Sequence, residues 1–174
     1  MTNDANCLCP GPGDAAFGPV TDNEFLNRVI LDPRHITKDG RLKSQFADSA
    51  SLRRLDLSAS RERYIDEEGM VRKAQTIMSS SPGGTGGGAV GYATTSVRLL
   101  REATGDDQEE VYLRHLCVID SRIDDANEKD ETHASIGFSE ATSNALSDDD
   151  LLLIRKWIAK HFGRSISLFA KPIK

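Results

Sequence analysis

The segment Glu110–Phe138 has the sequence EVYLRHLCVIDSRIDDANEKDETHASIGF, and its pattern decides the fold that we predict. Residues 111–120 form two alternating sets of side chains, and both sets are mostly apolar. Because side chains along a strand point to opposite faces in turn, this pattern predicts a central strand that is covered on both faces. Residues 124–131 are too charged for a core and predict a loop. Residues 132–138 become apolar again and predict a second strand that pairs with the first as a hairpin.

Three helices are expected outside this segment. Apolar residues recur at helical spacing in 66–79, where three acidic residues occupy the first turn. The last helix, ending before Gly163, has a capping signature in Ser147 and Asp150. A further helix is expected from Tyr92 to Ala103.

Strands are expected at 25–31 and, as an edge strand ended by Pro172, at 165–170. Residues 42–64 show no clean period, so no element is assigned there beyond three leucines that should anchor the core: Leu52, Leu55 and Leu57. Together these patterns predict a single α+β domain over 21–174, with a small mixed or antiparallel sheet flanked by two or three helices.

Two segments are too rich in glycine or proline for regular structure. Residues 1–20 predict a flexible N-terminal arm, and residues 79–91 predict a glycine-rich linker or mobile loop.

Composition narrows the classes of partner. The net charge of −5 and pI of 5.4 argue against broad phosphate contacts, so nucleic acid is not the expected partner. No apolar run reaches about 18 residues, so no membrane span is expected. The first 19 residues lack the basic start and apolar core of a secretory signal. With three cysteines, at least one cannot pair within a monomer, and reduced thiols in the cytoplasm are the simplest expectation.

The predicted hairpin carries the candidate catalytic residues. His115 and His133 lie on adjacent predicted strands, and Asp120 lies among the carboxylates between them. Imidazole with carboxylate can bind a divalent metal or act as a general base, which suggests a small hydrolase or nuclease-like enzyme. The alternative is a hydrogen-bonded histidine in a sheet beside a solvated acidic loop.

Two weaker motifs concern a cofactor and a metal. Gly86, Gly88 and Gly91 fit G-x-G-x-x-G, which would suit nucleotide binding at a helix N-terminus, although a helix rather than a strand is expected before them. Two Cys or His pairs at i, i+2 spacing could form a zinc site: Cys7 with Cys9, and His115 with Cys117.

Charge is distributed unevenly along the chain, because residues 34–73 are basic and residues 102–150 are acidic. The basic part supplies a candidate partner-binding face: Arg34, His35, Lys38, Arg41, Arg61 and Arg63. This asymmetry favours a cytoplasmic protein-interaction module that acts as an accessory, adaptor or inhibitor subunit, or that pairs with a second copy of itself. The hydrolase and nucleotide-binding hypotheses are the two alternatives.

Overall fold

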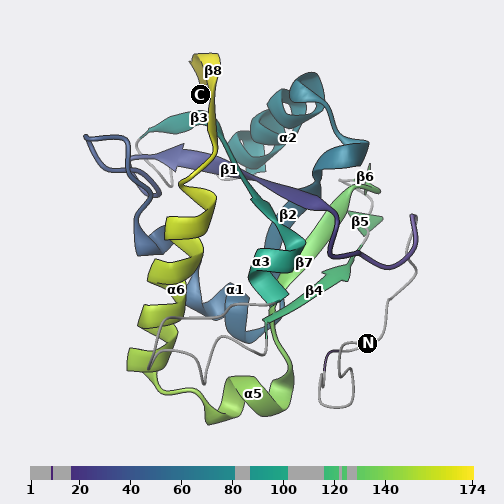
Figure 1. The fold of residues 1–174 in the computed structure, drawn as a ribbon. Coiled ribbons are helices and arrows are strands. Elements are labelled where there is room, and N and C mark those ends of the chain that lie inside the picture. The colour runs from purple at the N-terminus through teal and green to yellow at the C-terminus, as the bar shows by residue number, and fades with distance from the viewer. Residues whose placement is uncertain (1–8, 10–16, 81–86, 102–115, 122, 125–128) are drawn as a thin grey trace.

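The computed structural model describes residues 9, 17–80, 87–101, 116–121, 123–124 and 129–174 (Figure 1). These residues form a six-stranded antiparallel sheet in the order β4-β7-β2-β1-β3-β8. The strands are β1 (Phe25–Asp32), β2 (Leu57–Arg61), β3 (Gly88–Ser96), β4 (Leu116–Asp120), β7 (His133–Phe138) and β8 (Ile166–Ile173). A separate two-stranded hairpin joins β5 (Ile123–Asp124) to β6 (Lys129–Asp130).

The described residues also contain five α-helices and two short 3-10 turns. The helices are α1 (Ser49–Arg53), α2 (Glu67–Ser80), α3 (Val97–Arg101), α5 (Glu140–Ala145) and α6 (Asp148–Phe162), and the turns are η2 (Ser44–Phe46) and η3 (Glu62–Tyr64). The predicted α+β domain with a small antiparallel sheet is confirmed.

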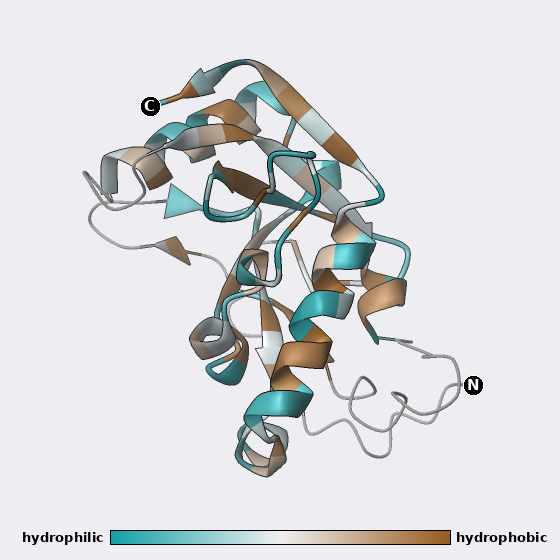
Figure 2. Cartoon of the chain, turned by 90° about the vertical axis from the view of Figure 1, so that its left-hand side faces the viewer, coloured by the Kyte–Doolittle hydropathy of each residue, from teal (hydrophilic) through white to brown (hydrophobic). Residues whose placement is uncertain are grey.

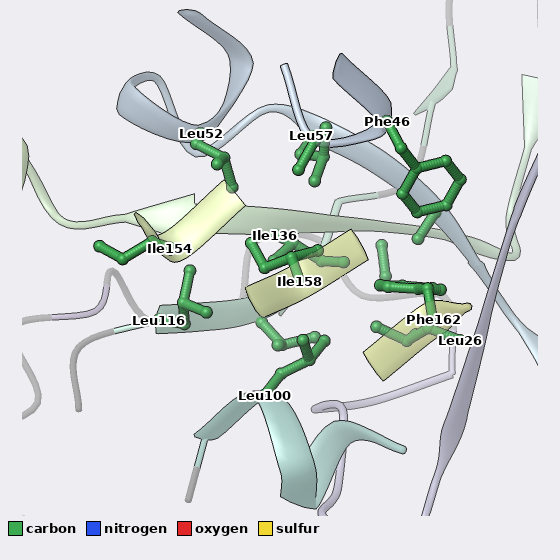
Figure 3. Close-up of a cluster of buried hydrophobic side chains, with 14 of the residues drawn as sticks. Leu26, Phe46, Leu52, Leu57, Leu100, Leu116, Ile136, Ile154, Ile158 and Phe162 are labelled. Atoms are coloured by element: carbon green, nitrogen blue, oxygen red, sulfur yellow. The ribbon is translucent and has the colours of Figure 1, made fainter. Parts of the chain in front are cut away.

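The larger core lies between the sheet and the helices α1, α3 and α6. Leu57 and Ala59 of β2 pair with Ile136 and Ala134 of β7, and all four point into this core. Figure 3 shows the apolar face of α6 meeting the same layer through Ile154, Ile158 and Phe162. Alternate side chains of these strands therefore point into this core.

The opposite side of the sheet is covered less evenly. Helix α2 packs on β1, β3 and β8 through a small second core that includes Met70, Ala74 and Phe169. On β2 and β7 the same side of the sheet carries polar side chains instead, and these are Ser58, Ser60, His133 and Ser135. A polar patch therefore lies within a sheet whose other face is apolar.

Several sequence predictions agree with the structure at the level of single elements. The strand at 25–31 is β1, the helix at 66–79 is α2, and β4 pairs with β7 as the expected hairpin. At the start of α6, the Ser147 hydroxyl and the Asp150 carboxylate cap each other's backbone N–H groups.

Two predictions about the elements are wrong, and one strand of the sheet was not predicted. β4 is an edge strand rather than a central one, because no described strand lies beyond it. The middle of the sheet includes β2, a strand that lies in the part of the chain without a clean period. The helix expected from Tyr92 is strand β3 up to Ser96, and among the described residues of that stretch the helical ones are 97–101.

The end of the predicted N-terminal arm packs against the domain. Val20 lies in the larger core, and the Phe17 ring stacks on Tyr64 with centroids 4.0 Å apart. Cys9 forms a disulfide with Cys117 of β4, with the two Cα atoms 5.6 Å apart. For these two cysteines the expectation of reduced thiols is therefore wrong. The rest of 1–16 lies outside the described residues.

Within the described parts of the chain, none of the helices combines the length and the apolar character that crossing a bilayer requires.

Candidate functional site

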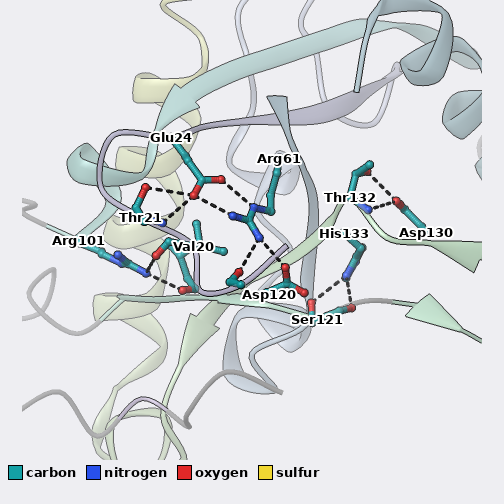
Figure 4. Close-up of polar contacts among 12 residues, drawn as sticks. Val20, Thr21, Glu24, Arg61, Arg101, Asp120, Ser121, Asp130, Thr132 and His133 are labelled. Atoms are coloured by element: carbon teal, nitrogen blue, oxygen red, sulfur yellow. Dashed lines mark hydrogen bonds and ion pairs between the residues drawn. The ribbon is translucent and has the colours of Figure 1, made fainter. Parts of the chain in front are cut away.

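A buried ion cluster lies where β2 ends. Arg61 is 1% exposed, and its guanidinium donates two hydrogen bonds to Glu24, at 2.7 and 2.9 Å. A third donor, Nη1, bonds the Asp120 carboxylate at 2.6 Å and the carbonyl of Gly18 at 2.8 Å (Figure 4). The cluster thus ties the N-terminal segment to β2 and to the end of β4.

The electrostatics of this cluster favour ionised partners. Burial alone would raise the pKa of Glu24, but hydrogen bonds from Arg61 and Thr21 outweigh it and hold the pKa below its usual range. Burial likewise would lower the pKa of Arg61, and the two carboxylates raise it above its ordinary value. Asp120, a predicted catalytic residue, is therefore occupied as a partner of Arg61.

His133 lies on the other side of the sheet from this cluster, in a network of hydroxyl groups. Its Nδ1 is 2.8 Å from the carbonyl oxygen of Ser121, and its Nε2 is 2.9 Å from the hydroxyl of Ser58. Nδ1 also lies 2.8 Å from the Ser121 hydroxyl, and the tautomer with the proton on Nδ1 suits both Ser121 oxygens and leaves Nε2 to accept from Ser58. Burial, with a smaller effect from Lys73, lowers the pKa of His133, so the ring is neutral.

Ser58 is the residue that the sequence analysis missed. The alternation of Leu57, Ala59 and Arg61 with Ser58 and Ser60 is a period-two signal, but it is too short and too mixed to assign a strand alone. The pairing of β2 with β7 brings Ser58 to His133 across 75 positions of sequence, a neighbourhood that no local pattern encodes.

A groove of about 1100 Å³ opens beside the ion cluster, between η3, the first turns of α2 and β6. Four cations line it, and these are Arg63, Arg72, Lys73 and Lys129. Four carboxylates line it as well, and these are Glu62, Asp66, Asp130 and Glu131. We call this hollow the η3 groove.

Side-chain contacts fix both walls of the η3 groove. Lys73 of α2 and Asp130 of β6 form a largely buried ion pair of 2.6 Å. Tyr64 is fixed on the other wall, because Phe17 stacks on its ring and the guanidinium carbons of Arg61 and Arg63 lie 4.8 and 4.9 Å from its centroid. The groove is therefore built on side chains whose positions are already determined.

The residues predicted to form one basic face are separated by the structure. Arg34, Lys38 and Arg41 are exposed in the loop after β1, whereas Arg63 is exposed in the η3 groove, near the other end of that strand. The eight residues of β1 span about 26 Å, so these cations belong to two clusters. Arg61 is buried in its ion cluster and is not available to a partner.

His35, the remaining residue of that predicted face, is buried. Its Nδ1 accepts a hydrogen bond from the Leu31 N–H, and its ring meets Phe46 edge-on. Burial, together with the nearby charges of Arg28 and Arg34, lowers the pKa of His35 to about 3. It is therefore a neutral core residue and contributes no positive charge.

The glycines of the proposed nucleotide motif lie in a strand. Gly88 and Gly91 belong to β3, and Gly86 lies outside the described residues. A Cβ atom on Gly88 would come within 2.5 Å of the Ile173 carbonyl oxygen, and one on Gly91 within 2.2 Å of that of Ser167. Close packing against β8 therefore accounts for both glycines.

The proposed metal sites find no support in the described part of the chain. No group of three or more His, Cys, Asp or Glu residues is arranged there to hold a metal ion. Cys9 and Cys117 bond to each other, and Cys7 and His115 lie outside the described residues.

No family model, curated protein or solved structure matched the chain. The assignment of the site therefore depends on its geometry and chemistry alone.

Replacing Arg61 tests the structural role of the ion cluster. Arg61→Met leaves two carboxylates buried without their cation and should lower the free energy of unfolding by about 3–5 kcal/mol. Urea unfolding measures this change. The triple variant that adds Glu24→Gln and Asp120→Asn should recover most of the loss, because no buried charge then remains.

The control is Arg72→Met, which removes an exposed pair with Glu68 and should cost less than about 1 kcal/mol. Equal losses from the two arginine variants would contradict the role assigned to Arg61.

Buried neutral histidines predict a loss of stability in mild acid. His35 has a pKa near 6.5 when unfolded and about 3 when folded, so the unfolded chain binds more protons below pH 6.5. Its contribution is complete above that pH and declines by up to about 1.4 kcal/mol per pH unit as the pH falls. Unfolding free energies at pH 6.5 and 5 measure the slope for the wild type and for His35→Asn, which keeps an acceptor for Leu31. The variant should have the shallower slope, and identical slopes would refute the assignment.

Proposed function

We propose that this protein is a protein-interaction module that binds a segment of a partner protein in the η3 groove. The observation that carries the proposal is the combination of size and charge in this hollow. About 1100 Å³ is lined by equal numbers of cations and carboxylates. Most of these charged side chains are exposed to solvent, and only Lys73 and Asp130 are partly buried.

Balanced charge selects the class of partner. A nucleic acid requires an excess of cations, which neither this groove nor the net charge of −5 supplies. A polypeptide segment that carries both signs can pair with both sets of side chains, and such complementarity determines specificity and association rate. The proposed partner is therefore a protein that presents a segment of mixed charge.

Tyr64 would be the anchor for that partner. Aromatic side chains with little freedom dominate binding energy at protein interfaces, and this ring is already held by Phe17 and by two arginines. Binding would thus carry only a small entropic cost for ordering the side chains of the groove.

The proposed role is that of an accessory, adaptor or inhibitor subunit. The cytoplasmic location predicted from the sequence stays a prediction, and the disulfide between Cys9 and Cys117 weighs against it. Reducing systems in most cytoplasms keep thiols reduced, whereas structural disulfides persist in oxidising compartments.

Site-specific photo-crosslinking tests the groove. A benzophenone side chain in place of Thr76, which lines the groove, should form one discrete adduct in cells of origin under ultraviolet light. Arg63→Glu reverses one charge of the groove and should reduce the adduct about tenfold. The adduct is measured by immunoblotting and its composition by mass spectrometry.

The matched control carries the same side chain in place of Lys156, an exposed residue of α6 that does not line the groove. It should give no adduct of that mass. The same adduct from both positions, or an adduct insensitive to Arg63→Glu, would contradict the proposal.

A second candidate function is hydrolysis by Ser58 and His133. The Ser58 hydroxyl donates to Nε2 at 2.9 Å, and the Ser121 carbonyl orients the ring through Nδ1 at 2.8 Å, which is the geometry of a nucleophile and its base. Two observations limit this candidate. His133 is 4% exposed, and neither residue lines the η3 groove.

A fluorophosphonate probe tests the second candidate, because it modifies only activated serine hydroxyls. Labelling should occur at Ser58 and should disappear in Ser58→Ala and in His133→Gln. Ser167→Ala removes an exposed serine and serves as the control. Mass spectrometry locates the modification, and an unlabelled folded protein would eliminate this candidate.

A further inference from the structure

Strand β8 ends the sheet with an open edge. It pairs with β3 on one side, and no described strand pairs with its other side. Figure 2 shows β8 along the rim of the molecule, with apolar residues distributed along it. An edge of this kind exposes a row of backbone N–H and C=O groups that another strand can bind.

The register shows which backbone groups of β8 point away from β3. The Thr94 N–H donates to the Ser165 carbonyl at 2.8 Å, so this opposed pair is hydrogen-bonded. Bonded and non-bonded pairs alternate along an antiparallel ladder, so Ser167 also faces β3. Ile166 and Leu168 consequently direct their N–H and C=O groups away from the sheet.

As far as the described residues show, the first half of the open edge lacks the usual protection. Natural edge strands carry charges or proline, or are covered by other elements. Ile166–Ala170 contains no charged residue and no proline, and Leu168 is 66% exposed. Lys171 and Pro172 follow at the end of the strand, and since proline has no N–H, it limits pairing to the first half.

The charges around this half select the chemistry of a partner. Arg164, Lys171 and Lys174 are exposed, and none of them forms an ion pair with a described residue. Every charged side chain between residues 164 and 174 is a cation, so a β8–β8 pair of two copies would bring like charges together. Such like-charge pairs are destabilising, which disfavours a second copy as the occupant.

We infer that the outer edge of β8 binds an extended segment of a partner protein, with an apolar centre and a carboxylate near each end. The segment runs antiparallel to β8 and bonds the backbones of Ile166 and Leu168. Arg164 lies in the turn just before β8 and Lys171 lies within the strand, and these two cations set the positions of the two carboxylates.

This surface is separate from the η3 groove, because no residue of β8 lines that groove. The inference goes beyond the proposed function and does not depend on it.

The probe is a fluorescein-labelled peptide of sequence Glu-Val-Thr-Val-Thr-Val-Thr-Glu, whose valines would lie opposite Ala170, Leu168 and Ile166. Fluorescence anisotropy measures its affinity for the full chain. A matched peptide with lysine at both ends should bind at least about tenfold more weakly. The double variant Arg164→Glu with Lys171→Glu should reverse this order, and both substitutions are at exposed positions, so the fold is retained.

Amide hydrogen exchange identifies the strand that is used. The amides of Ile166 and Leu168 should exchange rapidly in the free protein and slowly with the glutamate peptide bound. Arg63→Glu should leave peptide binding unchanged, so failure at β8 and failure at the groove can be told apart.

Three outcomes would overturn the inference. The first is equal affinity for the two peptides, and the second is no binding of the glutamate peptide at about 1 mM. The third is a dimer in sedimentation experiments in which the Ile166 and Leu168 amides are protected from exchange without peptide.

Discussion

The buried guanidinium of Arg61 is the interaction on which the rest of this structure depends. Ionised groups are costly to bury, and here the cost is offset because one cation pairs with two carboxylates from distant parts of the chain, Glu24 and Asp120, and also bonds the carbonyl of Gly18 near the first of them. Glu24 lies at the entry to β1 and Asp120 at the end of β4. The pairing therefore joins the start of the domain to one edge of its sheet.

The second constraint is the alternation of β2. Leu57 and Ala59 enter the larger core, whereas Ser58 and Ser60 face the polar patch beside His133. A slip of one residue would place the serines in the core, so burial of one face determines what lies on the other. The Ser58–His133 contact is a consequence of this register, whether or not it has a chemical role.

The two surfaces that we assign to partners differ in physical character. The η3 groove presents side chains of both signs around a fixed aromatic ring. The β8 edge presents backbone groups between cations. The η3 groove would therefore select a partner by the pattern of charges on its side chains. The β8 edge would select a segment whose backbone can adopt an extended conformation. A module with two such surfaces could bring two proteins together.

Local sequence determined those helices and strands whose capping residues and apolar pattern lie within one continuous segment. The capping residues Ser147 and Asp150 and the apolar stripe of α6 specify that helix, and the alternation around His133 specifies β7, including the side on which His133 lies. Only the tertiary structure decided that Arg61 is buried, that His35 is a neutral core residue and that β2 lies in the middle of the sheet. The physical reason is that burial and strand order depend on pairing between distant segments. A basic residue in an unpatterned stretch looks like solvated surface until the carboxylates that neutralise it are brought to it by the fold.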